Sequence, residues 1–382
     1  MRITATLFAT AFWLMATTPT LAAECEAPCL SFSFTSKLKS DWVFSANPSS
    51  KTGIDTGPSA ELELRYAPTD QLSFLGVITG ESVNDRRPGE NRTFKDLGLY
   101  AGALYAEYAA EPVTFRLGKF DPDFSLGSAT LDGQYAAGLS DTYDTEERWG
   151  VQAVYAFPGE ALSQSLTASL FTTDRSVLSQ SLGTDRGRLS LDDGGAGNVK
   201  GIGSAAAFYD ICSGAETGSC FADGDFGARI GLRYQKAGQP TQEQIDEEIV
   251  PQAELGYLGA VTRRVAISED TDLRLLGELA YFRNFEGGED NALIATASAA
   301  LNMGPVTYSA TYSQQRNHSG GNPATTDQLL SIGARYELGS SALLPGQSWT
   351  IDAGYSYLKR GDGTDDHRIG FSLAVALDRN LK

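Results

Sequence analysis

Apolar and polar residues alternate one by one along most of this chain. In residues 226–235 every second side chain is apolar, and the residues between them are glycine, arginine and glutamine. The same rhythm recurs in 60–66, 149–157, 306–312, 349–357 and 369–377. Successive side chains of a β-strand point to opposite faces, so this period of two predicts strands with one apolar and one polar face. The chain is therefore expected to be all-β.

Counting these segments gives about sixteen strands, with fourteen to eighteen as the range that uncertain boundaries allow. An even number of antiparallel strands brings both chain ends to the same side of the sheet. The expected strands are 30–45, 59–67, 71–82, 94–109, 112–120, 146–157, 163–173, 199–210, 225–236, 252–264, 271–284, 290–301, 304–314, 327–338, 348–359 and 367–378.

The connections between these strands alternate between short and long. Five alternate connections, 68–70, 110–111, 158–160, 268–270 and 302–303, are short. Those between them include 83–93, 121–145, 174–198 and 315–326, which are long and polar, although 211–224 and 285–289 depart from the pattern. Membrane barrels have short periplasmic turns and longer outer loops. The series therefore predicts a transmembrane antiparallel β-barrel whose apolar positions face lipid and whose polar positions face the lumen.

The N-terminal residues differ from the rest of the chain. Arg2 precedes an apolar stretch over 3–15, and the small residues of 19–23 follow it. This order is typical of a secretory signal peptide, and the apolar stretch is shorter than a membrane-spanning helix requires. We expect residues 1–23 to be removed and residues 24–382 to form a single barrel domain. The expected protein is exported.

The charge and the missing motifs narrow the functional classes. A formal charge of −18 argues against nucleic acid as a partner, because phosphates require a basic surface. The sequence lacks the nucleophile elbow, the phosphate-binding loop and the zinc-protease motif, so no cofactor or metal is expected. One constellation leaves a barrel enzyme open: Asp362, Asp365 and Asp366 beside His367 at an outer turn, where an oriented imidazole could activate water. An adhesion or structural barrel is the other alternative.

The segment 113–120, which runs into Asp121-Pro122-Asp123-Phe124 and a long third outer loop, resembles the corresponding part of Gram-negative outer-membrane porins. The strand rhythm of 24–382 resembles the same family, and more loosely its alphaproteobacterial members. The resemblance implies location in the cell outer membrane and a water-filled channel for passive diffusion of small hydrophilic solutes and ions, rather than an enzyme. It also implies a homotrimer and a third outer loop that folds into the lumen and narrows it.

If that loop enters the lumen, its carboxylates face the charged residues of the wall. Because the side chains of a strand alternate between its two faces, a set of arginines is expected to point into the lumen. Carboxylates opposite them would create a transverse electric field across the channel, and this field would select among solutes. The overall acidity favours cations. The expected constriction carboxylates are Asp121, Asp123, Asp132, Asp141 and Asp144, and the expected lumen arginines are Arg65, Arg116, Arg229, Arg233, Arg274 and Arg335.

The four cysteines form two close pairs, Cys25 with Cys29 and Cys212 with Cys220. In an oxidising compartment each pair could close a short disulfide, although four cysteines allow three pairings. Both pairs are expected at the periplasmic side. A disulfide between the N-terminal pair and the turn that carries Cys212 and Cys220 therefore stays open as an alternative. Neither spacing matches a zinc site, and the chain has only two histidines.

Overall fold

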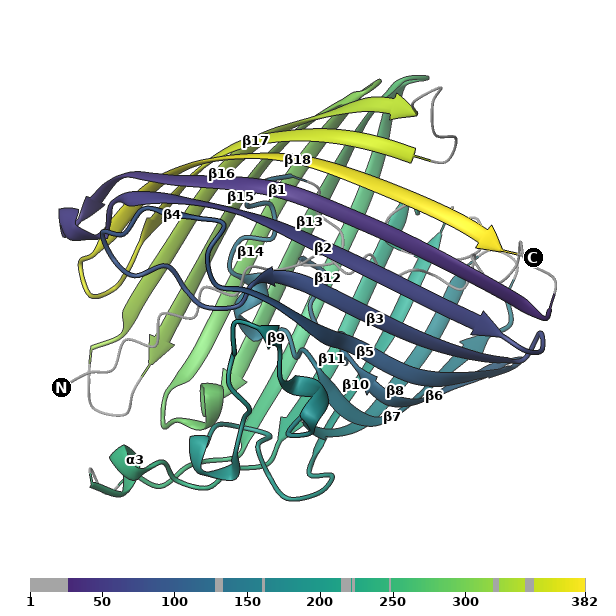
Figure 1. Ribbon diagram of the computed structural model, residues 1–382, viewed down its shortest axis with the longest axis horizontal. Helices are drawn as coiled ribbons and strands as arrows, with labels where there is room; N and C mark the ends of the chain where they lie inside the picture. Colours follow the sequence, from purple (N-terminus) through teal and green to yellow (C-terminus); the bar gives the residue numbers. More distant parts are fainter. Residues whose placement is uncertain are drawn as a thin grey trace.

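Sixteen long antiparallel strands form one closed barrel in the computed structural model, which describes residues 27–127, 133–159, 162–213, 221, 224–246, 249–318, 323–340 and 347–381 (Figure 1). The long strands are β1 (Cys29–Asn47), β2 (Gly53–Ala67), β3 (Leu72–Ser82), β5 (Leu97–Ala110), β6 (Val113–Phe120), β7 (Arg148–Phe157), β8 (Ser163–Thr173), β10 (Ser204–Ser213), β11 (Phe226–Gln235), β12 (Glu254–Ser268), β13 (Thr271–Arg283), β14 (Asn291–Met303), β15 (Val306–His318), β16 (Thr325–Ser340), β17 (Gln347–Lys359) and β18 (Asp365–Leu381).

The remaining elements are short and lie in the connections. They are the strands β4 (Arg92–Thr93) and β9 (Leu182–Gly183), the 3-10 helices η1 (Ser49–Lys51), η2 (Ser140–Tyr143), η3 (Val177–Ser179), η4 (Leu191–Asp193) and η5 (Phe285–Gly287), and the helix α3 (Gln242–Asp246). Among the described residues, no helix has the length and apolar character needed to cross a membrane.

The barrel closes between its first and last strands. β1 pairs with β18 in an antiparallel register that runs from Leu30 opposite Leu381 to Asn47 opposite Asp365. Each long strand pairs with its neighbour in the chain, so both ends of the barrel domain lie at the end with the short connections, which we call the turn end. The opposite end is the loop end. The predicted fold class and strand number are confirmed.

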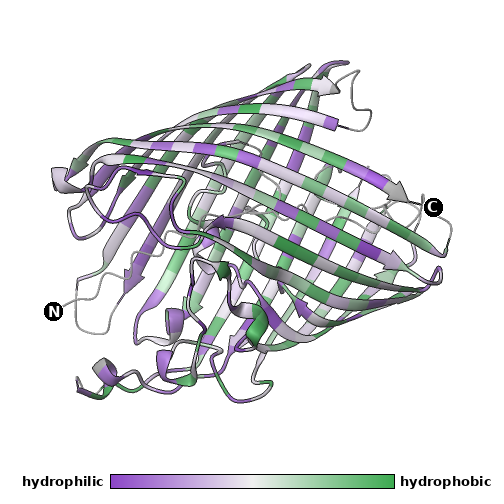
Figure 2. Ribbon diagram, in the orientation of Figure 1, coloured by the Kyte–Doolittle hydropathy of each residue, from purple (hydrophilic) through white to green (hydrophobic). Residues whose placement is uncertain are grey.

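The alternation of the sequence becomes two faces of one wall. Figure 2 shows hydrophobic and hydrophilic residues alternating along the strands. On β11, Leu232 is 53% exposed on the outer face, whereas its neighbour Arg233 points inward and is 3% exposed. An outward apolar band is the surface that membrane barrels present to lipid.

The first outer connection is shorter than the sequence indicates. Gly57 and Pro58 are typical turn residues, and the strand was expected to begin at Ser59, but β2 already begins at Gly53. Proline lacks a backbone donor and is therefore confined to strand edges. Pro58 fits this rule because β2 pairs with β3 only from Ala60 onward. Next to this unpaired edge, β4 returns from the following loop and pairs in parallel with Asp55 and Thr56.

Candidate functional site: a loop folded into the barrel

The connection between β6 and β7, residues 121–147, is called here the inserted loop; its described parts, 121–127 and 133–147, lie inside the barrel. Its first arm, 124–127, contacts β11 and β13, where Phe124 lies against Gly231 and Leu126 donates its N–H to Glu278. Its tip, 133–138, reaches β15, β16, β17, β18 and β1. The described parts of the loop therefore contact the inner wall at β11 and β13 and at every strand from β15 to β1. The expectation that the third outer loop folds into the lumen is confirmed.

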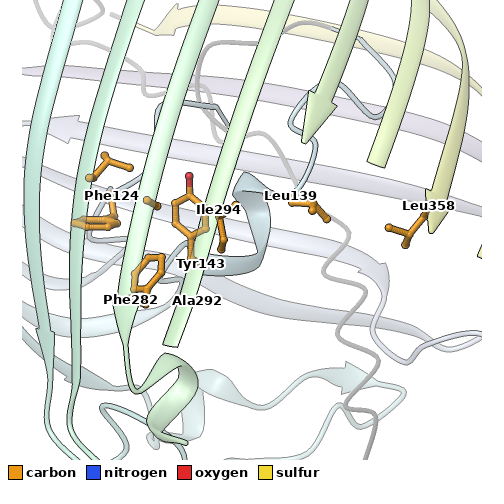
Figure 3. Close-up of a cluster of buried hydrophobic side chains, with 9 residues drawn as sticks. Phe124, Leu139, Tyr143, Phe282, Ala292, Ile294 and Leu358 are labelled. Carbon is orange, nitrogen blue, oxygen red and sulfur yellow. The ribbon is translucent and has the colours of Figure 1, made fainter. Parts of the chain in front are cut away.

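An apolar core joins the inserted loop to the wall (Figure 3). Phe124 and Tyr143 of the loop pack around Phe282 of β13, with ring centroids 6.1 and 5.3 Å from that ring. Burying side chains of this size contributes about 1.5–3 kcal/mol each. The full cluster comprises Phe124, Leu139, Tyr143, Leu258, Ala280, Phe282, Ala292, Ile294 and Leu358, and a second cluster joins Leu126 and Ala136 to Ala260 and Leu276.

A single wall carboxylate holds both arms of the loop. Glu278 of β13 accepts hydrogen bonds from the Ser125 hydroxyl at 2.8 Å and from the backbone N–H groups of Leu126 and Gly127 at 2.6 and 3.2 Å. It also accepts one from the Tyr143 hydroxyl, on the returning arm. Glu278 is 4% exposed, and four donors compensate for the cost of burying its charge.

Two of the predicted lumen arginines lie beneath the loop rather than along open space. Arg233 pairs with Glu254 at 2.8 Å, donates to the Tyr143 carbonyl, and lies against the rings of Phe124 and Phe282. Arg229 pairs with Asp210 of the neighbouring strand at 2.7 Å and is likewise buried.

The other four predicted arginines also have carboxylate partners on the wall. Arg65 and Arg116 share Glu107, at 3.3 and 2.9 Å, and Arg116 stacks on Tyr105. Arg274 pairs with Asp272 at 3.5 Å, and Arg335 pairs with Asp352 at 2.7 Å. The structure thus places all six arginines on the inner face, as parity predicts, but in ion pairs within the wall. Their role in permeation stays a prediction.

The predicted loop carboxylates have different surroundings. Asp121 accepts the N–H of Glu147 at 2.6 Å and Asp144 accepts that of Ser125 at 3.1 Å, so both hold the backbone of the loop itself. Asp123 is exposed, and Asp132 lies outside the described residues. Asp141 is half-buried, and its Oδ1 atom accepts no hydrogen bond from the described part of the chain.

Burial, and to a lesser extent the negative charges of Asp144 and Glu146, raise the pKa of Asp141 to about 8. Burial also raises the pKa of Asp121 well above its usual range. These shifts follow from the cost of placing a negative charge among other carboxylates away from bulk water.

The base of the inserted loop is tied to the next outer loop through Lys119 of β6. The Lys119 ammonium is fully buried and lies 2.6 Å from Glu147 and 2.8 Å from Asp174. Arg186 also pairs with Glu147 and stacks on the ring of Tyr100, 3.6 Å from its centroid. Both ends of the inserted loop, its arms and its tip are therefore fastened.

Sequence reasoning missed charged residues of the inner wall at and beside the tip of the inserted loop. On β1, Lys37, Lys39 and Asp41 are half-buried inward residues, and Lys39 pairs with Asp41 at 2.8 Å. On β3, Glu81 accepts a hydrogen bond from Tyr100 at 2.6 Å. The signal was available, because the β1 residues alternate with Leu38 and Trp42 in the sequence.

Among the described residues, the hydrogen-bond partner of His367 is a tyrosine and not one of the neighbouring aspartates. His367 stacks on Tyr357, with ring centroids 4.6 Å apart, and its Nδ1 atom lies 2.8 Å from the Tyr355 hydroxyl on the outer face of β17. Asp366 is buried on the inner face, where it pairs with Arg360 and Arg368. Neighbouring residues of a strand point to opposite faces, so this carboxylate cannot orient this imidazole.

The described residues contain no group of three or more histidine, cysteine or acidic side chains able to hold a metal ion. Neither Cys29, at the start of β1, nor Cys212, at the end of β10, is a free thiol, and both lie at the turn end. Cys25 and Cys220 lie outside the described residues, so the predicted pairing stays a prediction.

Comparison with known proteins shows similarity of fold. No family model and no curated protein matches the chain. Among solved structures, the outer-membrane channel DcaP of Acinetobacter baumannii aligns with a TM-score of 0.53 and 11% identity over 91% of this chain and 97% of that one. The trimer form of Vibrio cholerae OmpT gives 0.51 and 11% over 92% and 99%. The anion-selective porin of Comamonas acidovorans gives 0.50 and 12% over 92% and 99%. The chain has the fold of outer-membrane porins and channels.

Proposed function

We propose that this protein is an outer-membrane porin that forms a water-filled channel for passive diffusion of small hydrophilic solutes and ions. One observation carries the proposal: a sixteen-strand barrel is wide enough for an aqueous lumen, and a fastened loop occupies one side of it. We further propose export through a signal peptide over residues 1–23. Assembly as a homotrimer is supported by the trimer form of the similar OmpT structure.

The proposed passage runs between the inserted loop and the wall formed by β1, β2 and β3. On the opposite wall, the loop packs against inward apolar side chains of β12, β13 and β14, namely Leu258, Ala260, Leu276, Ala280, Phe282, Ala292 and Ile294. Beside the point where the tip contacts Asp41, the inward residues Lys37, Lys39, Glu61 and Glu81 of β1 to β3 are charged and only half-buried. Water and ions follow charged, solvated surfaces rather than an apolar packed one.

Purified protein inserted into a planar lipid bilayer is expected to give stable, stepwise ionic conductance in both directions. The His367→Ala variant is expected to conduct like the wild type, because His367 lies on the outer face among aromatic rings. A correctly assembled protein without open-channel steps would contradict the channel and favour an adhesion or structural barrel. Hydrolysis of a peptide substrate that is lost in His367→Ala would favour the enzyme.

The ion selectivity of the channel is expected to depend on pH through Asp141. Because the pKa of Asp141 is raised to about 8, this carboxyl is mostly neutral below that pH and negatively charged above it. The permeability ratio of K⁺ over Cl⁻, measured from the reversal potential in a salt gradient, is therefore expected to rise between pH 7 and pH 9. Asp141→Asn should reduce this rise. Asp192→Asn, at an exposed position of another loop, serves as the matched control and should retain it.

A further inference from the structure

A row of glycines crosses the inner wall where the tip of the inserted loop lies. Gly333 of β16 is directly opposite Gly354 of β17, and Gly354 is directly opposite Gly370 of β18. The next residue in this row is Asp41 of β1, opposite Gly370. Three neighbouring strands therefore lack side chains at one level of the barrel, and the fourth strand carries a carboxylate there.

The loop tip occupies the space that side chains would otherwise fill. A Cβ atom on Gly354 would lie 2.9 Å from the Gln134 Cβ and 3.0 Å from the Gln134 carbonyl oxygen. A Cβ atom on Gly370 would lie 2.5 Å from the Tyr135 hydroxyl and 2.9 Å from the Gln134 Cγ. Contacts between real Cβ atoms and their neighbours are longer than this, so any side chain at these positions would displace the tip.

Hydrogen bonds fasten the tip in the same place. The Tyr135 hydroxyl donates to Asp41, which also accepts from the Gln134 amide at 3.3 Å. Ser331 of β16 donates to the Tyr135 carbonyl at 2.9 Å. Tyr135 has a backbone φ of +67°, a conformation that non-glycine residues seldom adopt unless surrounding contacts impose it. The tip is held by specific contacts and not only by its connection to the loop arms.

We propose that Gly333, Gly354, Gly370 and Asp41 form a seat that holds the loop tip against the wall and thereby sets the width of the passage. This inference rests on the proposed channel function, since width matters only if solutes pass. In this arrangement the glycines are pore-determining residues although they do not face the solute, because they decide how far the loop extends from the wall into the lumen.

Gly354→Val is expected to push the tip off the wall and into the passage, and so to lower the single-channel conductance. Gly259→Val is the matched control, since a Cβ at Gly259 of β12 meets no atom within 4 Å. It should conduct like the wild type. If Gly354→Val assembles as the wild type does and its conductance is unchanged, the seat does not set the width.

A cross-link tests the seat without any measurement of conductance. In the double variant Gln134→Cys/Gly354→Cys, the two Cβ atoms would lie 2.9 Å apart if the tip did not move. A disulfide requires about 3.5–4.5 Å between Cβ atoms, so the small shift of the tip that relieves this contact brings the pair into disulfide range, and oxidation of the folded protein should join them. Peptide mapping by mass spectrometry distinguishes this bond from those of the native cysteines. The pair Gln134→Cys/Gly339→Cys, whose second position has open space around it, should not cross-link.

The two experiments separate the possible failures. Absence of the Gln134–Gly354 cross-link would overturn the seat, whether or not the protein conducts. A cross-link formed in a protein that never conducts would leave the seat in place and reject the proposed channel.

Discussion

Glu278→Ala is expected to release both arms of the inserted loop and to increase the single-channel conductance and its fluctuations. Four donors lose their acceptor at once, among them the Leu126 and Gly127 N–H groups and the Tyr143 hydroxyl. Hydrogen bonds to a buried charge contribute about 1.5–3 kcal/mol each, and donors left buried without a partner add a penalty. Water would enter between the loop and β13 to solvate them, and the loop would lose its fixed position.

The controls separate the hydrogen bonds from the charge. Glu278→Gln keeps an acceptor oxygen at the same place and should show a smaller increase than Glu278→Ala. Glu269→Ala removes an exposed carboxylate of the same charge at the turn before β13 and should leave the conductance unchanged. If Glu278→Ala conducts as steadily as the wild type, Glu278 does not hold the loop.

Leu232→Arg is expected to impair assembly of the barrel in a membrane. Leu232 lies in the middle of β11 and points outward, 53% exposed. A charged residue on the lipid face costs about 2–4 kcal/mol near the bilayer midplane. The expected results are a lower free energy of unfolding in lipid vesicles and a smaller folded fraction on gels.

Leu232→Ala provides the control for this second prediction. It removes the same side chain without adding charge, so it should lower the unfolding free energy by less than Leu232→Arg. Equal losses in the two variants would mean that position 232 does not face lipid, and the outward parity of β11 would have to be reassigned.

The strands were predictable because one physical rule governs all of them. A wall with different surroundings on its two faces requires alternation, so 226–235 or 369–377 can be recognised without knowledge of the rest. Turn residues were a less reliable guide than alternation. In the first hairpin, Gly57 and Pro58 indicate a turn but lie inside β2. Pairing with β1 over the whole length of β2 outweighs these local preferences.

The site was less predictable because it depends on contacts between distant segments. Parity correctly points Arg229 and Arg233 inward, but it cannot show that the inserted loop covers them. Likewise, composition identifies Asp121 and Asp144 as acidic but not as acceptors for the loop's own backbone. One signal was present: Leu276, Ala280, Phe282, Ala292 and Ile294 are apolar although they lie at inward positions, which indicates that an apolar segment covers that part of the wall.

The apolar core around Phe282 affects how the barrel responds to a denaturant dissolved in the surrounding water. The outer surface of the barrel is apolar. The apolar core inside the barrel, in contrast, is shielded from water in the lumen only by the inserted loop. Urea weakens apolar burial and also solvates peptide groups, so it acts directly on this inner core through the lumen. The barrel therefore has the apolar outer surface of a membrane protein and an inner core like that of a water-soluble protein. As the urea concentration rises, the core between the inserted loop and the wall is expected to unfold before the barrel itself.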